Sequence, residues 1–517
     1  MYRFIFWICC FCLQACMVGP HYHEPKKLVS EKWIKNTQIK NKPSKINAHW
    51  WDVFHDPILT ALIHRGYENN LTLQSAAARV LQTRAQLAQS VGELFPQQQA
   101  IIGNLTYNQL GGQDLQSLLP STFETAVAGF SVNWEIDFWG KYRRAILAND
   151  AAFLASYAAY DNALVTLTSD IAGSYINIRT TQELITIFQQ NVAIQKMGLN
   201  IAHSRYTNGQ TSLLDVEQAQ SELSQTESVI PKLVSELRRN KDRLAVLLGT
   251  TPDKVDGLLT QKRGIPKAPW GAAVGIPRET LAKRPDITQA RLLAIAQLES
   301  IGVAKANLFP SITIPGTIAF ASNNINGESL ADIFSIRNLT ITAGPSVNWP
   351  ILNYGQITNA VRAQDAIYQQ ALLNYQNTVL KAQQEVQDHI TDFIESKKSE
   401  RDLIVANQSA IASTKLAIIR YREGESDYTP VLNSEKQQLM VQTSLTNTQG
   451  DIPLALVALY RAMGGGWQIR HCRDIVPLSI KRQMAARTNW GDLLRQKNHE
   501  APRNHSQSYN ERTLPHW

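Results

Sequence analysis

Hydrophobic and polar residues follow two different periods along this chain, one typical of long helices and one typical of strands. From residue 141 to about residue 205, apolar residues recur every three or four positions and no proline interrupts them. The recurring positions are Tyr157, Tyr160, Leu164, Leu167, Ile171, Tyr175 and Ile178. This spacing predicts a long helix that buries a narrow apolar seam against partner helices. At 1.5 Å per residue, such a helix is about 100 Å long.

The same helical pattern returns in the second part of the chain. The equivalent apolar positions are Leu372, Tyr375, Val379, Ala382, Val386, Ile390 and Phe393. Both long helices are predicted to end at glycine turns, at Gly209 and Gly424, and to be followed by return helices over about residues 212–248 and 429–463. A further helical pattern starts near Asp56 and runs to about residue 94, where a proline stops it.

Alternation of apolar and polar residues, broken in the first long segment by Val127, marks four other segments. Residues 126–134 and 339–349 alternate in this way and each ends in tryptophan, and shorter alternating runs cover residues 101–107 and 312–320. A period of two predicts strands with one apolar and one polar face. We therefore expect two strands in each half of the chain and four in total.

The two halves repeat each other in sequence as well as in pattern. Val132-Asn133-Trp134 returns 215 positions later as Val347-Asn348-Trp349, and Leu94-Phe95-Pro96 returns as Leu308-Phe309-Pro310. This period is too long for a solenoid or propeller repeat and indicates a duplicated half-molecule. We assign a first structural repeat to residues 49–249, a linker or small equatorial segment to 250–277, and a second structural repeat to 278–466.

Four amphipathic strands have two unpaired edges, so they cannot line a membrane alone. A closed barrel needs about eight strands, which two chains would supply, whereas three chains would supply twelve. The long helices must also bury their seams against neighbours. The pattern therefore favours an α+β membrane protein that assembles as a trimer.

The first residues have the features of a signal peptide, which we assign to residues 1–15. Arg3 is followed by an apolar stretch too short to span a bilayer, and Ala15 precedes Cys16. Leu13-Gln14-Ala15-Cys16 resembles a bacterial lipobox, which predicts lipidation of Cys16 and a lipidated linker over residues 16–48. Secretion without lipidation is the alternative. Met17 after the cysteine favours the outer membrane by analogy with bacterial lipoproteins.

Composition excludes several other classes of protein. Four of the five cysteines lie in the first sixteen residues, so a disulfide framework is excluded, and the Cys9-x-x-Cys12 spacing falls inside the apolar signal stretch. The net charge is +8, and the basic tail at 467–517 reads as a solvated, partly disordered extension. No aromatic-interleaved basic patch accompanies it, so nucleic-acid binding is disfavoured.

Taken in order, several motifs carry a family resemblance over roughly residues 16–466. They are Cys16 with Val18-Gly19-Pro20, Trp50-Trp51 with Phe54, Asp56-Pro57, Leu308-Phe309-Pro310, Trp349-Pro350 and the paired Tyr-x-x-Gly turns. The chain resembles the outer-membrane factor family of tripartite efflux and secretion systems, the TolC and OprM group, and within it the lipidated NodT-like branch. The resemblance implies a homotrimeric 12-stranded outer-membrane β-barrel continuous with a long periplasmic α-helical barrel. It also implies a periplasmic adaptor protein and an inner-membrane pump of the resistance-nodulation-division type as partners.

The helix tips are the best candidates for function, because the family closes its periplasmic end there through hydrogen bonds and carboxylate rings. Asp215 lies six residues after Gly209, whereas Pro430 and Asn433 stand where the family often has aspartates, which puts the usual acidic ring in doubt. Asp427, Glu423 and Glu425 are an alternative ring or a solvated turn. Tyr421 and Arg422 are candidate latch partners, with ordinary capping and packing as the alternative. The tip candidates are Asp427, Tyr421, Arg422, Glu423, Glu425, Asp215 and Asn433, with Gly209 and Gly424 as the turns.

Other candidate residues are few. Trp134 and Trp349 are placed either as membrane-interface anchors or as junction residues between strand and helix. Asp161 and Asp170 are expected on solvated helix faces. No catalytic motif is recognised in the sequence, and we expect no enzymatic activity, cofactor or metal site.

Three functions remain. The first is the outer-membrane channel of a tripartite efflux system, a passive conduit for small toxic compounds. The second keeps the fold and assigns type I secretion of proteins or peptides. The third is a lipid-anchored periplasmic coiled-coil scaffold without a pore, which the strand alternation disfavours because a scaffold needs no apolar strand face.

Overall fold

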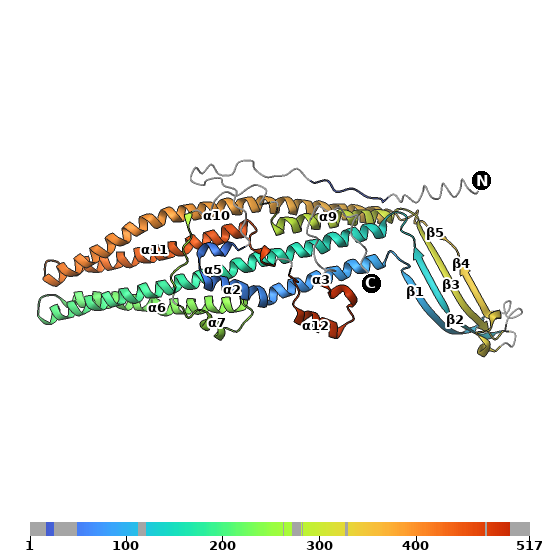
Figure 1. Ribbon diagram of the computed structural model, residues 1–517, viewed down its shortest axis with the longest axis horizontal. Helices are drawn as coiled ribbons and strands as arrows, with labels where there is room; N and C mark the ends of the chain where they lie inside the picture. Colours follow the sequence, from blue (N-terminus) through green and yellow to red (C-terminus); the bar gives the residue numbers. More distant parts are fainter. Residues whose placement is uncertain are drawn as a thin grey trace.

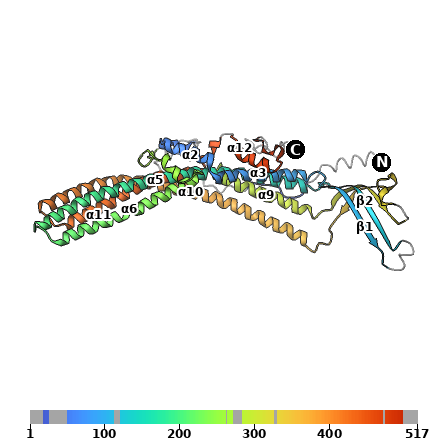
Figure 2. The ribbon, with the colours of Figure 1, turned by 90° about the horizontal axis from the view of Figure 1, so that it is seen from below.

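The chain forms an elongated rod with a β-sheet at one end and two helical hairpins at the other (Figure 1). This computed structural model describes residues 17–24, 49–111, 120–261, 263–270, 281, 283–325, 329–470 and 473–496. The expected signal peptide and Cys16 lie outside the described residues. Figure 2 shows that shorter helices lie along the middle of the rod, beside the long ones.

Two long helices and their return helices build the rod. They are α5 (Lys141–Thr207) with α6 (Leu213–Leu247), and α10 (Gln356–Glu423) with α11 (Thr429–Ala462). The bounds agree closely with those expected from the apolar period. The predicted seam of α5 is fully buried, and the seam of α10 is buried from Val379 onward.

The helical pattern before the first strand is two helices rather than one. These are α2 (Pro57–Asn69) and α3 (Leu71–Gly92), so the expectation of one run past residue 70 was wrong. Asn70 makes the break, because its side chain accepts a hydrogen bond from the backbone N–H of Leu73 at 2.8 Å and so caps α3. It also donates to the carbonyl of Leu247 at 2.9 Å, which ties the break to the end of α6.

Besides these, the described part of the chain has one further long helix, α9, in the second half, and several short ones. Before α2 the chain forms the 3-10 helix η1 (Trp50–Phe54), α7 follows α6, and α9 precedes the second half's strands. Their bounds are α7 (Asp253–Leu258), α9 (Pro285–Ala306), η3 (Leu330–Asp332), η4 (Ile336–Asn338), η5 (Trp467–Arg470), α12 (Leu478–Arg487) and η6 (Gly491–Leu494). None of the described helices combines the length and apolar character needed to cross a membrane.

The sheet has four positions, all antiparallel, filled by five described strands. β1 (Gln98–Gln109), β2 (Thr122–Glu135) and β3 (Ser311–Asn323) are followed by β4 (Leu339–Ala343) and β5 (Ser346–Asn348), which both pair with β3. The single strand expected over residues 339–349 is therefore interrupted, at Gly344 and Pro345. Proline lacks the N–H that the ladder requires, which explains the interruption.

Strand register places the apolar residues of all four positions on one face. Ile101 lies opposite Phe130, which lies opposite Ile318, which lies opposite Ile341, and all four side chains are exposed. The neighbouring row, on the opposite face, is Ala100, Ser131, Thr317 and Thr342. One face of the sheet thus presents large, exposed apolar side chains, whereas the other has mainly small or polar ones, with Ile102, Phe123 and Val127 as exceptions.

The segment after the second half packs against the body, contrary to the expectation of a solvated tail. Ile475 and Val476 are buried in the main apolar core, and Trp490 and Leu494 pack on it. The expectation of a solvated tail was therefore wrong for residues 473–496. It rested on the number of basic residues and did not consider these apolar positions. Residues 497–517 lie outside the described part.

Arg470, just before that segment, also corrects the expectation for Asp161. Asp161 is 8% exposed, and the Arg470 guanidinium donates to its two carboxylate oxygens at 2.7 and 3.1 Å. Burial raises the pKa of Asp161 to about 6, although the arginine acts in the opposite direction. Asp170 is more open and pairs with Arg461 at 3.2 Å.

Candidate functional site

The two hairpin tips lie at the end of the rod far from the sheet (Figure 1). Each tip has its own turn, and the two turns have the same backbone geometry. Gly209 and Gly424 have φ angles of +70° and +83°, a conformation that glycine adopts without strain. In both turns the residue after the glycine donates its N–H to an arginine carbonyl: Gln210 to Arg205 at 2.8 Å and Glu425 to Arg420 at 2.9 Å. This hydrogen-bonded turn ends each long helix and reverses the direction of the chain.

Tyr421 joins the two tips. Its side chain is 1% exposed, and its hydroxyl donates to Asp215 of α6 at 3.0 Å. Asp215 also accepts a hydrogen bond from the hydroxyl of Thr211. The Tyr421 ring packs edge-on against Tyr428, with 5.1 Å between centroids, in a small core that also contains Val431. A residue of the second hairpin is thus held by a carboxylate of the first.

Arg205 makes the second connection between the tips. Its guanidinium donates to the backbone carbonyl of Tyr421 and lies 4.7 Å from the centroid of the Tyr421 ring. Arg205 is not among the tip residues predicted from the sequence. Its position directly before the tyrosine of the turn could have suggested a role at the tip. Arg420 has the same position in the second half, however, and among the described contacts it makes none of this kind, so position alone does not predict the contact.

The hydroxyl of Tyr421 is protonated over a wide pH range. Burial, and then the hydrogen bond to the Asp215 carboxylate, raises the pKa of Tyr421 to about 12, while Thr211 and Arg205 act in the opposite direction. The phenol therefore remains a hydrogen-bond donor at physiological pH. This is the state in which it can hold Asp215.

The other predicted tip residues lie on the surface. Arg422 pairs with Glu423 at 3.0 Å, and Glu425 pairs with Arg420 at 3.5 Å, all with exposed side chains. Asp427 and Asn433 are also exposed. The structure therefore brings together Tyr421 and Asp215 from the predicted set, whereas Asp427 stays in the solvated turn.

Trp134 and Trp349 occupy matching places at the junction of sheet and helices. The indole N–H of Trp134 donates to the carbonyl of Leu94 at 3.3 Å, and that of Trp349 donates to the carbonyl of Leu308 at 3.1 Å. Both leucines follow the helix that precedes the first strand of their half. The two tryptophans therefore tie strand end to helix end in both repeats.

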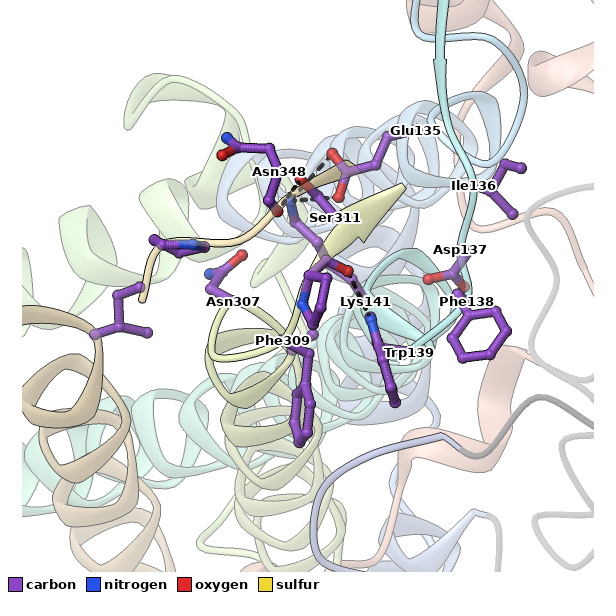
Figure 3. Close-up of a pocket in the computed structure, with 14 residues that line it drawn as sticks. Glu135, Ile136, Asp137, Phe138, Trp139, Lys141, Asn307, Phe309, Ser311 and Asn348 are labelled. Atoms are coloured by element: carbon purple, nitrogen blue, oxygen red, sulfur yellow. Dashed lines mark hydrogen bonds and ion pairs between the residues drawn. The ribbon is translucent and has the colours of Figure 1, made fainter. Parts of the chain in front are cut away.

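A cavity of about 220 Å³ lies at the same junction (Figure 3). Trp139 donates to the carbonyl of Pro310 at 2.8 Å and stacks on Phe309, with 4.6 Å between ring centroids. Lys141 at the start of α5 pairs with Glu135 at 3.3 Å. Glu135 and Lys141 of the polar lining thus pair β2 with α5. Among the described residues, no group of three or more His, Cys, Asp or Glu side chains is placed to hold a metal ion.

The residues that directly follow Cys16 are fixed to this junction. The N–H of Val18 donates to the carbonyl of Trp139 at 3.1 Å. Arg144, which is buried, donates to the carbonyls of Val18 and Pro20 at 3.2 and 3.1 Å and pairs with Glu299 of α9 at 2.6 Å. Gly302 gives the space for this contact, since a Cβ there would lie 2.9 Å from the Val18 carbonyl oxygen.

Known proteins match this chain over nearly its whole length. Nodulation protein T of Rhizobium leguminosarum bv. trifolii is 27% identical over 456 residues, which cover 88% of this chain and 95% of that protein. The cation efflux system protein CusC of Escherichia coli O6:H1 is 26% identical, with coverage of 88% and 97%. The pyoverdine export outer membrane protein OpmQ of Pseudomonas putida is 29% identical, with coverage of 82% and 89%.

Solved structures share the fold. The outer-membrane channel OprN superposes with a TM-score of 0.79 at 28% identity, covering 88% of this chain and all of that one. The CmeC outer membrane channel of Campylobacter jejuni gives a TM-score of 0.78 at 21% identity, which supports the fold alone. The sequence model described as outer membrane efflux protein matches residues 62–250 and 276–465, well over half of the chain. The chain therefore belongs to the outer membrane efflux protein family.

Proposed function

We propose that this efflux protein of the outer membrane works as a homotrimeric, passive conduit in a tripartite system. Each chain would add four strand positions to a 12-stranded barrel and its long helices to a periplasmic helical tunnel. A periplasmic adaptor and an inner-membrane pump, of the resistance-nodulation-division type, would complete the path. The protein would provide water-filled passage and no enzymatic chemistry.

The amphipathic sheet is the observation that carries this proposal. An exposed apolar row from Ile101 to Ile341 suits contact with lipid, and the opposite row suits water. Within the described residues, β1 pairs only with β2, and β4 and β5 pair only with β3, so both edges can accept neighbouring strands. A scaffold without a pore would need neither feature.

Small solutes are the proposed cargo. The relatives are named for the efflux of cations, for pyoverdine export and, in the Pseudomonas putida protein TtgF, for toluene efflux. These names support export of small compounds over type I secretion of proteins. The specific substrate of this chain is set by its pump rather than by a binding site described here.

The tip contacts are the proposed gate. Tyr421, Asp215 and Arg205 would hold the two hairpins together and so keep the periplasmic end narrow. Three copies of Asp427 around one axis would form the acidic part of a ring that attracts cations and repels anions, while Glu423 and Glu425 would be balanced by Arg422 and Arg420. Arg422 and Asn433 would lie beside that ring, and Trp134 and Trp349 would sit at the periplasmic membrane surface.

Conductance across planar bilayers tests the pore and the gate together. Purified wild-type protein should give small, cation-selective channels, and Arg205→Ala with Tyr421→Ala should raise the conductance several-fold. Tyr206→Ala, at the matching place in the first half, is the control and should leave the conductance unchanged. Absence of channels in every variant would reject the conduit.

The lipid anchor is proposed from the fixed position of residues 17–20. Because Arg144 holds Val18 and Pro20 at the sheet end of α5, an acyl chain on Cys16 would enter the membrane beside the barrel. Cys16→Ala should abolish acylation, measured by mass spectrometry, and leave a protein that still fractionates with the outer membrane. Complete loss from the outer membrane would mean that the lipid is required for insertion rather than tethering alone.

A further inference from the structure

The interface between the two hairpins contains a buried polar stretch next to the tip. Helices α5 and α11 run antiparallel there, as their close contacts indicate: Asn191 donates to Gln442 at 2.7 Å, and Gly198 lies beside Glu435. Ala202 and Val431, which belong to the apolar core at the tip, lie one turn further on. Most of the facing residues between the tip core and Gln442 are therefore polar, unlike the apolar seam deeper in the rod.

Glu435 is the unusual member of this stretch. It is 2% exposed, and neither of its carboxylate oxygens accepts a hydrogen bond of normal geometry. Its space exists because residue 198 is glycine: a Cβ at that position would lie 3.3 Å from a Glu435 oxygen and 3.2 Å from the Tyr428 hydroxyl. The Tyr428 hydroxyl is the hydrogen-bonding group beside the carboxylate, and no cation among the described residues neutralises it, so an ionised carboxylate is costly at this buried site, whereas a protonated one is tolerated.

No cation reaches Glu435 from the helices around it. Lys436, the next residue in the chain, pairs instead with Glu222 of α6 at 3.2 Å, and Glu222 lies close enough to disfavour a second negative charge. From α5 the facing residues are Gln195, whose amide atoms are unpartnered, and Gly198. From α10, Thr414 donates to the carbonyl of Ser434 and carries no charge. Tyr428 is the remaining titratable group beside the carboxyl, and the Asp215, Tyr421 and Arg205 contact lies next toward the tip.

We propose that Glu435 is a proton-controlled latch: when protonated it keeps α11 closed against α5, and when ionised it favours separation of the two hairpins. This inference rests on the proposed gate, because the same hairpins form the tip contacts. It adds a regulator that lies behind the gate and responds to proton concentration. The latch would open the periplasmic end as pH rises.

The direction of the pH effect follows from the site. Burial, and then the neighbouring Glu222, raises the pKa of Glu435 to about 7, with Tyr428 acting in the opposite direction. Because the pKa is raised in the closed seam, the contribution to closure is complete below about 4.5 and is lost as pH rises through about 7. The difference between these values sets a ceiling of roughly 300-fold on the change in the opening equilibrium of one chain.

The test compares full-length wild-type protein with Glu435→Gln, which mimics the protonated acid at every pH. Amide hydrogen exchange over residues 431–442 is measured for both proteins at the same pH, from 5 to 8.5. The ratio of wild-type to variant rates should be no more than about fourfold at pH 5 and should rise at least about tenfold above that value by pH 8. Glu222→Gln should make this rise smaller and end it at lower pH, because loss of the neighbouring carboxylate lowers the pKa of Glu435 in the closed seam.

Glu217→Gln is the control, since Glu217 is an exposed residue of α6 and its change removes the same charge. It should follow the wild type at every pH. A rate ratio that stays flat, or an equal response in Glu217→Gln, would overturn the latch. Conductance recorded in parallel separates the two proposals: a pH-dependent exchange ratio without channels rejects the conduit, whereas channels that open with Tyr421→Ala but show the same pH response in Glu435→Gln reject the latch.

Discussion

The two hairpin tips have the same backbone turn but different side-chain partners. The side chain of Arg205 contacts Tyr421 of the other hairpin. Its counterpart in the second half, Arg420, pairs with Glu425 of its own turn. Tyr421 is buried between the hairpins, whereas Tyr206, its counterpart, is 41% exposed. Where the first half has Asp215 as an acceptor, the second half has Pro430.

Because of this difference, the two hairpins contribute different groups to the contact between the tips. The first hairpin supplies the charged groups and the second supplies the aromatic ring and its hydroxyl. Within the described residues, Tyr421 is the point at which both Asp215 and Arg205 of the first hairpin hold the second. The two copies of the tip thus keep the same backbone turn but contribute different side chains to the contact between the hairpins.

The largest expected effect comes from the tyrosine pair. Tyr421→Ala removes a buried ring together with its bond to Asp215, and should lower the free energy of local opening at the tip by about 3 kcal/mol. Tyr206→Ala should change it by less than about 0.5 kcal/mol because that side chain is exposed. Hydrogen exchange of residues near 431 measures both. Equal effects would mean that the tips are symmetric in energy despite their geometry.

The arginine pair sharpens the same comparison with a smaller effect. Arg205→Ala loses a charge-assisted hydrogen bond and a ring contact, and should cost about 1–2 kcal/mol in the same measurement. Arg420→Ala removes an exposed ion pair and should cost about 0.5 kcal/mol or less. A double variant with Tyr421→Ala, which removes the ring, tells whether Arg205 acts through it. Additive losses would contradict that contact.

The tryptophan pair should show the smallest difference, because here the two halves match. Trp134→Phe and Trp349→Phe each lose one indole hydrogen bond, to Leu94 and Leu308, at about 1 kcal/mol or less. Trp349 is 54% exposed, so water replaces part of its loss and its effect should be the smaller. Thermal unfolding in detergent is the measurement. A loss several times larger at one tryptophan would show that the junction, like the tip, has diverged between the halves.

Local pattern was sufficient for the elements but not for their partners. The period of three and four residues predicted α5 and α10 closely, and alternation predicted the strand positions, since burial along one face leaves that signature in the chain. The interruption at Pro345 and the cap at Asn70 also had local signals, which the longer pattern concealed. For the candidate site, Tyr421 and Asp215 were predicted individually but not as a pair, because residues in different hairpins give no sign in the sequence of which will meet.

Long-range packing decided the remaining features. The sequence suggested a solvated carboxylate at Asp161, whereas in the fold Arg470, some three hundred positions away, pairs with it and it is buried. Glu435 looked like an ordinary polar position of a helix, and only its place opposite Gly198 makes it buried and unpaired. By itself the sequence determined the duplicated order of long helices, glycine turns and alternating strands, because these depend on neighbours a few positions apart. The asymmetric tip contact and the buried acid behind it were decided by the tertiary structure alone, because charge and burial depend on side chains that only folding brings together.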